Sequence, residues 1–375
     1  MIQNCRFSGI TQGPSETDLQ REGLPCVKTD TIWSSITKAC KAVAFSMACT
    51  AFSTNVMAAE KQTLKYAYVL PASHYLWTEG ARVFTEQGTA ATNGNVIFEV
   101  YPAAQLGKDN LAVLQSGLAD LALIIPSYSS DKLPLSTVSE LPGMYNNSCE
   151  GTAKFWEITR PGGILYEQEL KPLGLYPVFA AVLIPYRIFT SKKEVADIED
   201  LAGLKIRANG SAMNKTMITL GAVPVRASSP ELYDAVSRGT VDGALFTMNA
   251  LEQYSLDQVL NYMVEGPQLG SAGIIIAMNE KNWNSLSAET QKIMMDAGEM
   301  TRKRLCKWMD DDDQSVRDKL VSDGKLKPPT LTADEVAEWN KQVSSVADGW
   351  ASELDAVGLK ATAVLDEFRK AETSD

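Results

Sequence analysis

A single histidine, His74, is the one imidazole that the sequence offers for catalysis. A Ser–His–Asp or Cys–His mechanism would have to use it. The chain has no GxSxG elbow, Walker loop or GxGxxG motif, and no CxxC or HExxH metal spacing. His74 follows a predicted strand and begins a predicted helix, where binding groups gather in α/β sheets. We therefore expect no catalytic residue, no cofactor and no metal site, and His74 is either a ligand contact or a surface or capping residue.

Two arginines stand among apolar residues, Arg187 near the start of the segment 186–193 and Arg207 at the end of a predicted strand. Arginine rarely lies in such a strand without a partner. One interpretation is a structural salt bridge to a carboxylate such as Asp200 or Glu231. The other is a fork for a ligand carboxylate, because a planar guanidinium donates two parallel hydrogen bonds. The residues alone leave both open.

The composition is that of an ordinary globular protein, with 375 residues of which 45% are hydrophobic and 22% charged. This length is ample for two compact domains. The formal net charge of −11 argues against a nucleic-acid partner, because phosphate binding depends on clusters of Lys and Arg. It does not exclude a small anion, since one buried arginine can hold a carboxylate whatever the global charge.

Alternating strand and helix patterns indicate parallel sheets covered by helices. Six segments are predicted strands, at 64–70, 96–101, 120–125, 204–207, 223–225 and 241–246. Helices are predicted between them at 74–92, 110–116, 212–219 and 230–237, the last with Ser229 as its cap. Two longer helical regions follow at 288–320 and 333–370.

Two of these units resemble each other. Gly117 and Gly239 are each followed three residues later by an aspartate, Asp120 and Asp242, and then by Ala-Leu at the same offset. Glycine suits a left-handed helix end, and aspartate suits the turn into a strand. Because both units fall at the same place in their patterns, we expect two similar lobes.

An acidic run occupies positions 310–313 of the first long C-terminal helix. We expect a solvated helix face there. A cation site is the alternative, but consecutive carboxylates on a helix point in different directions and lack the loop geometry that calcium needs.

The N-terminal region has the pattern of a secretory signal. Lys38 and Lys41 precede a short apolar run, and small residues follow at 56–59. The run is too short to span a membrane. We expect residues 1–59 to be a leader, with cleavage after Ala58 or Ala59.

Four of the six cysteines fall in that leader, which leaves Cys149 and Cys306 in the mature chain. They could form one disulfide or remain two buried thiols, and sequence cannot choose between these.

Several ordered motifs together resemble the solute-binding proteins of TRAP (tripartite ATP-independent periplasmic) transporters. They are DIEDLAGLKIR at 197–207, LGAVPV at 220–225, ELYDAVSRGTVDG at 231–243 and YPAAQLG at 101–107. The resemblance implies an α/β clamshell of two lobes, each a mostly parallel sheet flanked by helices, with long C-terminal helices bracing both. The expected division is 60–184 for the first lobe, 185–280 for the second and 281–375 for these helices.

The resemblance also implies where the ligand binds. Arg207 lies where the family places the arginine that pairs with the ligand carboxylate, and Arg187 has the spacing of a second arginine that often assists. Asn214 and the Ser228–Ser229 pair fall at positions that often line the cleft.

The sequence departs from the family pattern after the last strand of each repeated unit, where Phe246 and Tyr128 stand. Family members that bind sugar acids often have a polar asparagine after the 241–243 motif. An aromatic pair favours an apolar or aromatic acid over a heavily hydroxylated one.

We therefore expect the protein to capture a small organic acid in the periplasm of a Gram-negative bacterium. We expect it to act as a monomer and to deliver the acid to the small and large subunits of a TRAP permease. A periplasmic ligand sensor, or a binding protein of another transporter class, needs the same clamshell and is an alternative. A periplasmic enzyme using His74 is a third.

Overall fold

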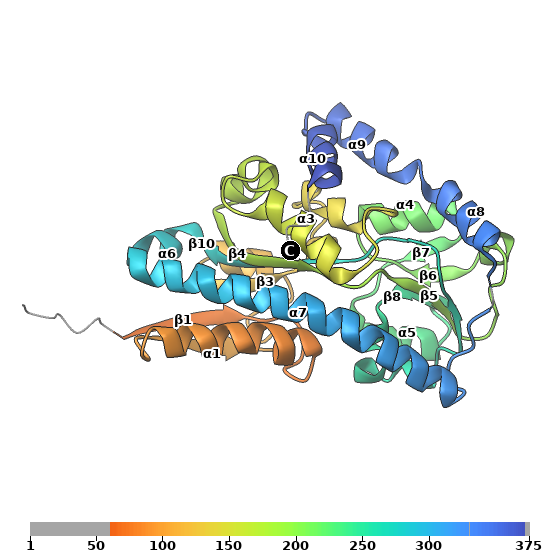
Figure 1. Ribbon diagram of the computed structural model, residues 1–375, viewed down its shortest axis with the longest axis horizontal. Coiled ribbons are helices and arrows are strands. Elements are labelled where there is room, and N and C mark those ends of the chain that lie inside the picture. The colour runs from red at the N-terminus through yellow and green to blue at the C-terminus, as the bar shows by residue number, and fades with distance from the viewer. Residues whose placement is uncertain (1–60, 330, 372–375) are drawn as a thin grey trace, which may run out of the picture. The chain divides into compact units, whose positions relative to one another are not determined.

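The computed structural model of the protein describes residues 61–329 and 331–371, and residues 58–375 form one compact unit. The expected leader and its cleavage point near Ala58 or Ala59 lie outside the described residues. Two five-stranded sheets with helices packed against them make up the fold (Figure 1). Among the described helices, none is both long and apolar enough to cross a membrane.

The first sheet has the strand order β2-β1-β3-β10-β4. Its strands are β1 (Gln62–Ala67), β2 (Val96–Tyr101), β3 (Leu121–Ile124), β4 (Leu175–Val182) and β10 (Gly273–Asn279). The second sheet has the order β7-β6-β8-β5-β9. Its strands are β5 (Arg187–Thr190), β6 (Lys205–Arg207), β7 (Val223–Val225), β8 (Gly243–Phe246) and β9 (Tyr262–Val264).

Both sheets have the same topology. In the first, β1 is parallel to β2 and β3, while β10 is antiparallel to both of its neighbours. In the second, β6 is parallel to β7 and β8, while β5 is antiparallel to both of its neighbours. One strand of each sheet therefore runs against the other four, and the expected fold class of two mostly parallel sheets is confirmed.

The helices are mostly those that the patterns predicted. The first five are α1 (Arg82–Ala91), α2 (Asn110–Gln115), α3 (Ser148–Thr159), α4 (Ser211–Thr219) and α5 (Leu232–Ser237), and all of them precede β8. The second half holds α6 (Glu280–Ser285), α7 (Ala288–Ser322), α8 (Ala333–Val343), α9 (Val346–Ala356) and α10 (Ala361–Lys370). Short 3₁₀ or π turns occur at η1 (Leu76–Ala81), η2 (Pro126–Tyr128), η3 (Leu135–Glu140), η4 (Tyr166–Leu170), η5 (Lys171–Leu173), η6 (Ile198–Leu201), η7 (Ser229–Glu231), η8 (Met248–Ala250), η9 (Glu252–Tyr254) and η10 (Leu256–Gln258).

Two helix predictions need correction. The region 333–370 is three helices, and the break before α10 contains Gly358 in the left-handed region at φ 89°. The cap of the helix at 230–237 is Ser228, which forms a capping box with Glu231, and Ser229 is the first residue of η7.

The repeated unit has the same backbone chemistry in both sheets. Gly117 and Gly239 adopt φ of 75° and 70°, so each can end its helix in a left-handed turn. The Asp120 carboxylate accepts the backbone N–H of Lys65 at 2.7 Å, and that of Asp242 accepts the N–H of Lys205 at 2.9 Å. Each aspartate thus fastens its own strand to the neighbouring one, which explains why the motif recurs.

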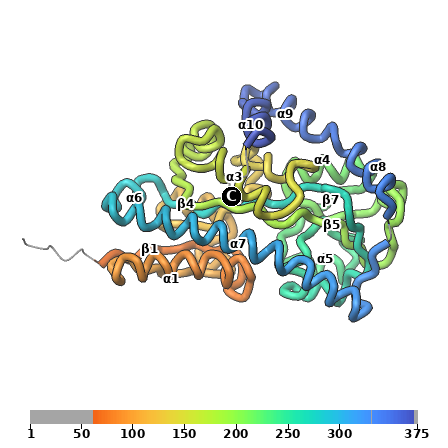
Figure 2. Tube along the Cα trace, viewed as in Figure 1, coloured from red at the N-terminus to blue at the C-terminus, as the bar shows by residue number. Residues whose placement is uncertain are grey.

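The chain crosses between the sheets twice, from β4 to β5 and from β9 back to β10 (Figure 2). The two crossing segments bind each other, because Leu183 N–H donates to Ala272 O at 3.0 Å and Tyr186 N–H donates to Gly270 O at 2.9 Å. The expected division placed residues 185–280 mainly in the second lobe. Within that range, β10 (Gly273–Asn279) lies in the first sheet.

The helix α7 contacts both lobes. It packs on α1, α3 and β4 of the first lobe and on η8 of the second, and at 35 residues it is roughly 50 Å long (Figure 1). The helices α8 and α9 pack on α4 of the second lobe, and α10 returns to α3 and η3 of the first.

The acidic run on α7 is not simply a solvated face. Asp310 accepts the backbone N–H groups of Ser148 and Cys149 at the start of α3, at 2.7 and 3.1 Å. Asp312 accepts the Asn249 amide at 2.8 Å. Each of these carboxylates faces a different element because successive residues on a helix are rotated by about 100°. Among the described residues there is no cluster of acidic, His and Cys side chains that could hold a metal ion.

A disulfide joins Cys149 at the start of α3 to Cys306 on α7 and closes a loop of 157 residues. This settles the choice that the sequence left open. It lies next to the Asp310 contacts and so ties α7 to the first lobe.

We predict that reducing this disulfide, or the Cys149→Ser/Cys306→Ser double substitution, lowers the free energy of unfolding by about 2–5 kcal/mol, because the cross-link restricts a long loop in the unfolded chain. Urea unfolding with and without reductant measures this, with thiol titration confirming reduction. The double variant should not respond to reductant. An unchanged unfolding midpoint in fully reduced wild-type protein would contradict the prediction.

Candidate ligand-binding site

A narrow cavity of about 30 Å³ lies between the two lobes. Its wall comes from the ends of strands in both sheets, which is the usual position of ligands in open α/β sheets. It includes five of the residues that the sequence analysis proposed as ligand contacts, His74, Tyr128, Arg207, Ser229 and Phe246. Leu70, Leu76, Ile125, Ser127, Leu183, Tyr186, Asn209, Met213, Thr247, Ala272 and Ile274 complete the wall.

Arg207 is the cation of this cavity, and its side chain is only 2% exposed. Its Nε donates to Ala227 O at 2.9 Å and its Nη1 to Leu245 O at 3.2 Å. No carboxylate of the described residues lies within ion-pair distance. Because a guanidinium has five N–H donors and these two bonds use only two, the remainder can hold a ligand carboxylate.

Asn209 supports this arrangement. Its amide donates to the same Ala227 carbonyl at 2.9 Å, and its oxygen accepts Ala227 N–H at 3.2 Å. The sequence analysis did not propose Asn209 as a site residue. The available signal was its position two residues after Arg207, because alternate residues of an extended segment face the same side.

Aromatic rings lie among the aliphatic side chains of the apolar wall. The Arg207 guanidinium lies 5.2 Å from the centre of the Phe246 ring, within cation–π range. Phe246 in turn packs against Tyr186 and Tyr254, with both ring centroids at 6.2 Å. The cavity therefore combines one cationic fork with an aromatic surface.

His74 is buried in the same wall as a neutral imidazole. Its Nδ1 accepts the backbone N–H of Leu76 at 3.1 Å, so the proton is on Nε2. Its ring lies 4.6 Å from that of Tyr75 and 5.6 Å from that of Tyr254. Burial lowers the pKa of His74 to about 3, so it carries no charge at neutral pH.

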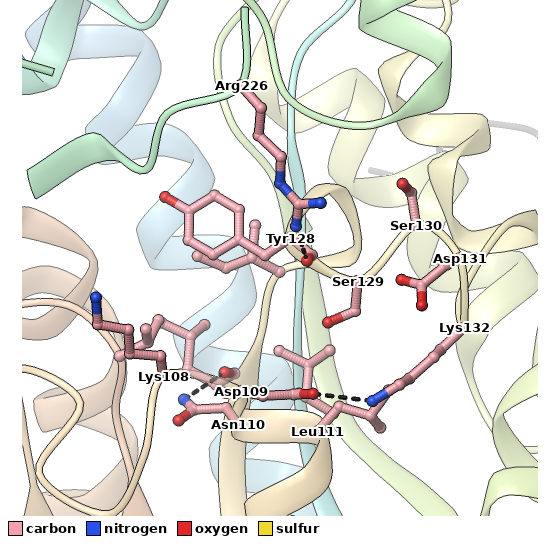
Figure 3. Close-up of a pocket in the computed structure, with 14 residues that line it drawn as sticks. Lys108, Asp109, Asn110, Leu111, Tyr128, Ser129, Ser130, Asp131, Lys132 and Arg226 are labelled. Atoms are coloured by element: carbon pink, nitrogen blue, oxygen red, sulfur yellow. Dashed lines mark hydrogen bonds and ion pairs between the residues drawn. The ribbon is translucent and has the colours of Figure 1, made fainter. Parts of the chain in front are cut away.

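Direct hydrogen bonds connect the lobes at the edge of the cavity. The Tyr128 hydroxyl lies 3.1 Å from Ser229 Oγ and accepts Ser229 N–H at 3.3 Å. Arg226 donates to the Tyr128 carbonyl at 2.7 Å (Figure 3). Tyr128 and Ser229 therefore hold the two lobes together as well as lining the cavity.

A second, larger pocket of about 450 Å³ adjoins this edge (Figure 3). Three of its residues are cationic, but Lys132 pairs with Asp109 at 2.9 Å and Lys108 lies 3.8 Å from Glu231. These side chains are largely exposed, so solvent weakens their hold on an anion. The smaller cavity, with its buried guanidinium, is the better site for a carboxylate.

The structure does not bring Arg187 or Asn214 into the cavity. The Arg187 guanidinium donates two hydrogen bonds to the Asp313 carboxylate on α7, at 2.6 and 2.8 Å, and lies 3.6 Å from Glu265. Asn214 is on α4, outside the cavity wall. Arg187 thus has a salt bridge, but its partner is neither Asp200 nor Glu231, the two carboxylates considered from the sequence. Arg207 has no salt bridge among the described residues.

Two sheets joined by paired crossing segments, with a cavity between them, define a two-lobed solute-binding protein. The family described as bacterial extracellular solute-binding protein, family 7 (DctP), matches residues 66–353, and the chain belongs to this family. The family expected from the sequence motifs is confirmed.

Two relatives and one solved structure show how far this similarity extends. A solute-binding protein of Albidiferax ferrireducens is 28% identical over 49% of this chain, and the match spans only 54% of that relative. The C4-dicarboxylate-binding periplasmic protein DctP of Rhodobacter capsulatus is 26% identical over 81% of this chain and 90% of its own. A TRAP solute-binding protein of Rhodoferax ferrireducens T118, solved with copurified benzoate, has the same fold, with a TM-score of 0.74, 24% identity, and coverage of 82% of this chain and 96% of that one.

We predict that Asp313→Asn lowers the free energy of unfolding by about 1–3 kcal/mol, because it removes the charged partner of the largely buried Arg187. Ligand affinity should stay within twofold of wild type, since this pair is outside the cavity. Asp311→Asn is the matched control, because Asp311 is exposed and pairs only with Lys307 on the same helix. A tenfold loss of affinity in Asp313→Asn would place Arg187 in the binding site after all.

Proposed function

We propose that the protein captures a small monocarboxylate with an aromatic or otherwise apolar body and delivers it to a TRAP membrane permease. The observation that carries this proposal is Arg207, a buried cation with no carboxylate of the described residues within ion-pair distance. A ligand carboxylate would supply the missing charge, since a buried ion is costly unless it is paired. The benzoate in the related Rhodoferax structure supports an aromatic acid.

The aromatic wall supports the same ligand class. Phe246 lies against the guanidinium, so a ring or alkyl group attached to a bound carboxylate would meet apolar surface. His74 adds one neutral Nε2–H donor, which suits a single hydroxyl or carboxylate oxygen. A heavily hydroxylated acid would leave most of its polar groups without partners in this wall.

We place this function in the periplasm, with residues 1–59 removed as a leader and the monomer as the working form. The periplasmic relative in Rhodobacter capsulatus supports this location. An enzyme based on His74 fits less well, because a general base needs a pKa near the working pH and this imidazole titrates at about 3. A ligand sensor would use the same cavity and differs only in its protein partner.

Titration calorimetry with benzoate, an aliphatic monocarboxylate, succinate and glucuronate tests the ligand class. We expect benzoate to bind most tightly. If none of these acids binds to folded, unliganded protein, the proposed ligand class is wrong.

We predict that Arg207→Lys weakens benzoate binding at least tenfold, which corresponds to roughly 1.4 kcal/mol, because lysine keeps the charge but not the two parallel hydrogen bonds. Arg302→Lys, in an ion pair with Glu299 on α7, is the matched control and should bind normally. Calorimetry and unfolding are measured on the same samples. A variant that is less stable but binds with normal affinity would show that Arg207 has only a structural role.

We predict that Phe246→Leu reduces the preference for benzoate over an aliphatic monocarboxylate by about two- to tenfold, because aromatic contacts contribute about 0.5–1.5 kcal/mol beyond the area they bury. Leucine keeps the position apolar. Phe189→Leu on the adjacent strand β5 is the control, since Phe189 is equally buried but outside the cavity. An unchanged preference in Phe246→Leu would exclude Phe246 from ligand selection.

A further inference from the structure

Glu140, the last residue of η3, is a buried carboxyl group with no hydrogen-bond partner. It is fully buried, and neither of its carboxylate oxygens is hydrogen-bonded to any residue that the structure describes. Most buried polar groups have such a partner, so an exception calls for a physical explanation. An ionised carboxylate in this position would be costly without a nearby cation.

Glu140 lies directly behind the wall of the ligand cavity. A methyl group added at Gly210 would be 2.4 Å from Glu140 Oε2 and 3.1 Å from the Cβ of Ser127, which lines the cavity. A methyl group added at Gly270, in the crossing segment between the lobes, would clash with the backbone carbonyl of Glu140. The carboxyl group therefore lies behind the cavity wall, and the backbone of Glu140 lies against the connection that joins the two sheets.

Arg207 lies three residues before Gly210, against which the Glu140 carboxyl packs. Burial raises the pKa of Glu140 well above its usual range, and the charge of Arg207 opposes this rise. Tyr145 and Tyr186 are the other titratable groups nearby, and burial raises the pKa of both phenols, so they stay neutral.

The charged side chains on the other elements that pack against η3 are mostly paired. These elements are α4, α10, β10 and η2, and of these α4 and α10 carry charged side chains. Lys215 on α4 pairs with Glu353, and Arg369 on α10 pairs with Asp348. Lys370 lies 3.7 Å from Glu367 on the same helix, where Asp366 is also exposed.

We propose that Glu140 takes up one proton when a ligand carboxylate binds to Arg207, so that ligand binding and protonation of Glu140 are coupled. The proton comes from water or buffer and adds to one carboxylate oxygen, and no other bond forms or breaks. This inference rests on the proposed function, because it requires the ligand carboxylate to bind at Arg207.

The charge count explains the coupling. Without ligand, the guanidinium charge favours the ionised form of Glu140. A bound carboxylate neutralises that charge and places a second anion in the same low-dielectric region, where like charges disfavour joint ionisation. Protonation of Glu140 leaves one cation and one anion. By reciprocity, a neutral Glu140 must then favour ligand binding.

The test is calorimetric titration of benzoate into the mature protein from pH 5.5 to 8.5, in pairs of buffers with different ionisation enthalpies. The number of protons taken up follows from the dependence of the binding enthalpy on the buffer. We expect a measurable uptake of up to one proton, with affinity falling as pH rises, by up to about tenfold per pH unit where uptake approaches one. His74 does not contribute, because its pKa of about 3 lies below this range.

Glu140→Gln identifies the group. We expect this variant to bind benzoate without proton uptake, with an affinity independent of pH and at least equal to wild type at pH 8.5. Glu140→Met is a second variant, since replacing a buried charged group by an apolar one of similar size is often tolerated. Glu169→Gln is the control. Glu169 is also buried in the first lobe, and burial raises its pKa to about 7. Its carboxylate accepts hydrogen bonds from Leu135 and Ser136, which lie outside the cavity wall.

The outcomes separate the two proposals. Benzoate binding without proton uptake by the wild type over this range overturns the coupling and leaves the proposed function standing. Proton uptake that persists unchanged in Glu140→Gln or Glu140→Met also overturns it, and uptake lost only in Glu169→Gln assigns the proton elsewhere. If the wild type binds none of the tested acids, the proposed function fails and this inference fails with it.

Discussion

The organisation of the cavity depends on one unpaired charge, the buried guanidinium of Arg207. Two backbone carbonyls, those of Ala227 and Leu245, orient it without neutralising it. Asn209 fixes one of these carbonyls from the side. The result is a cation whose direction is set by the protein and which has no carboxylate of the described residues within ion-pair distance, an arrangement that suits the proposed binding of a carboxylate.

The two lobes meet at this charge through a small number of shared elements. The crossing segments hydrogen-bond to each other at Leu183 and Tyr186, and Tyr186 also belongs to the cavity wall. On the opposite side of the cavity, Tyr128 and Ser229 bond directly across the lobes. A ligand in the cavity therefore contacts both lobes, so its binding energy can change with their relative position.

The helix α7 connects the lobes through its acidic run. Asp310 caps α3 in the first lobe, while Asp312 and Asp313 bind Asn249 and Arg187 in the second. The disulfide at Cys306 fixes the same part of the helix to α3. One stretch of a single helix thus supplies contacts to both halves of the molecule, and the charged residues there are structural.

The sequence by itself determined the elements, the repeated unit and therefore the two similar lobes, because these follow from interactions over a few residues: side-chain periodicity, left-handed glycines such as Gly117, and the aspartate two positions before each Ala-Leu pair. Family motifs added Arg207 as the anchor candidate. Only the tertiary structure decided the partners of the buried charges. Arg187 meets Asp313 across 126 residues and Cys149 meets Cys306 across 157, while the Glu140 carboxyl packs against Gly210 from a distant segment. Local sequence cannot distinguish the paired Arg187 from the unpaired Arg207, since both stand beside apolar residues and their surroundings are set by how distant helices pack.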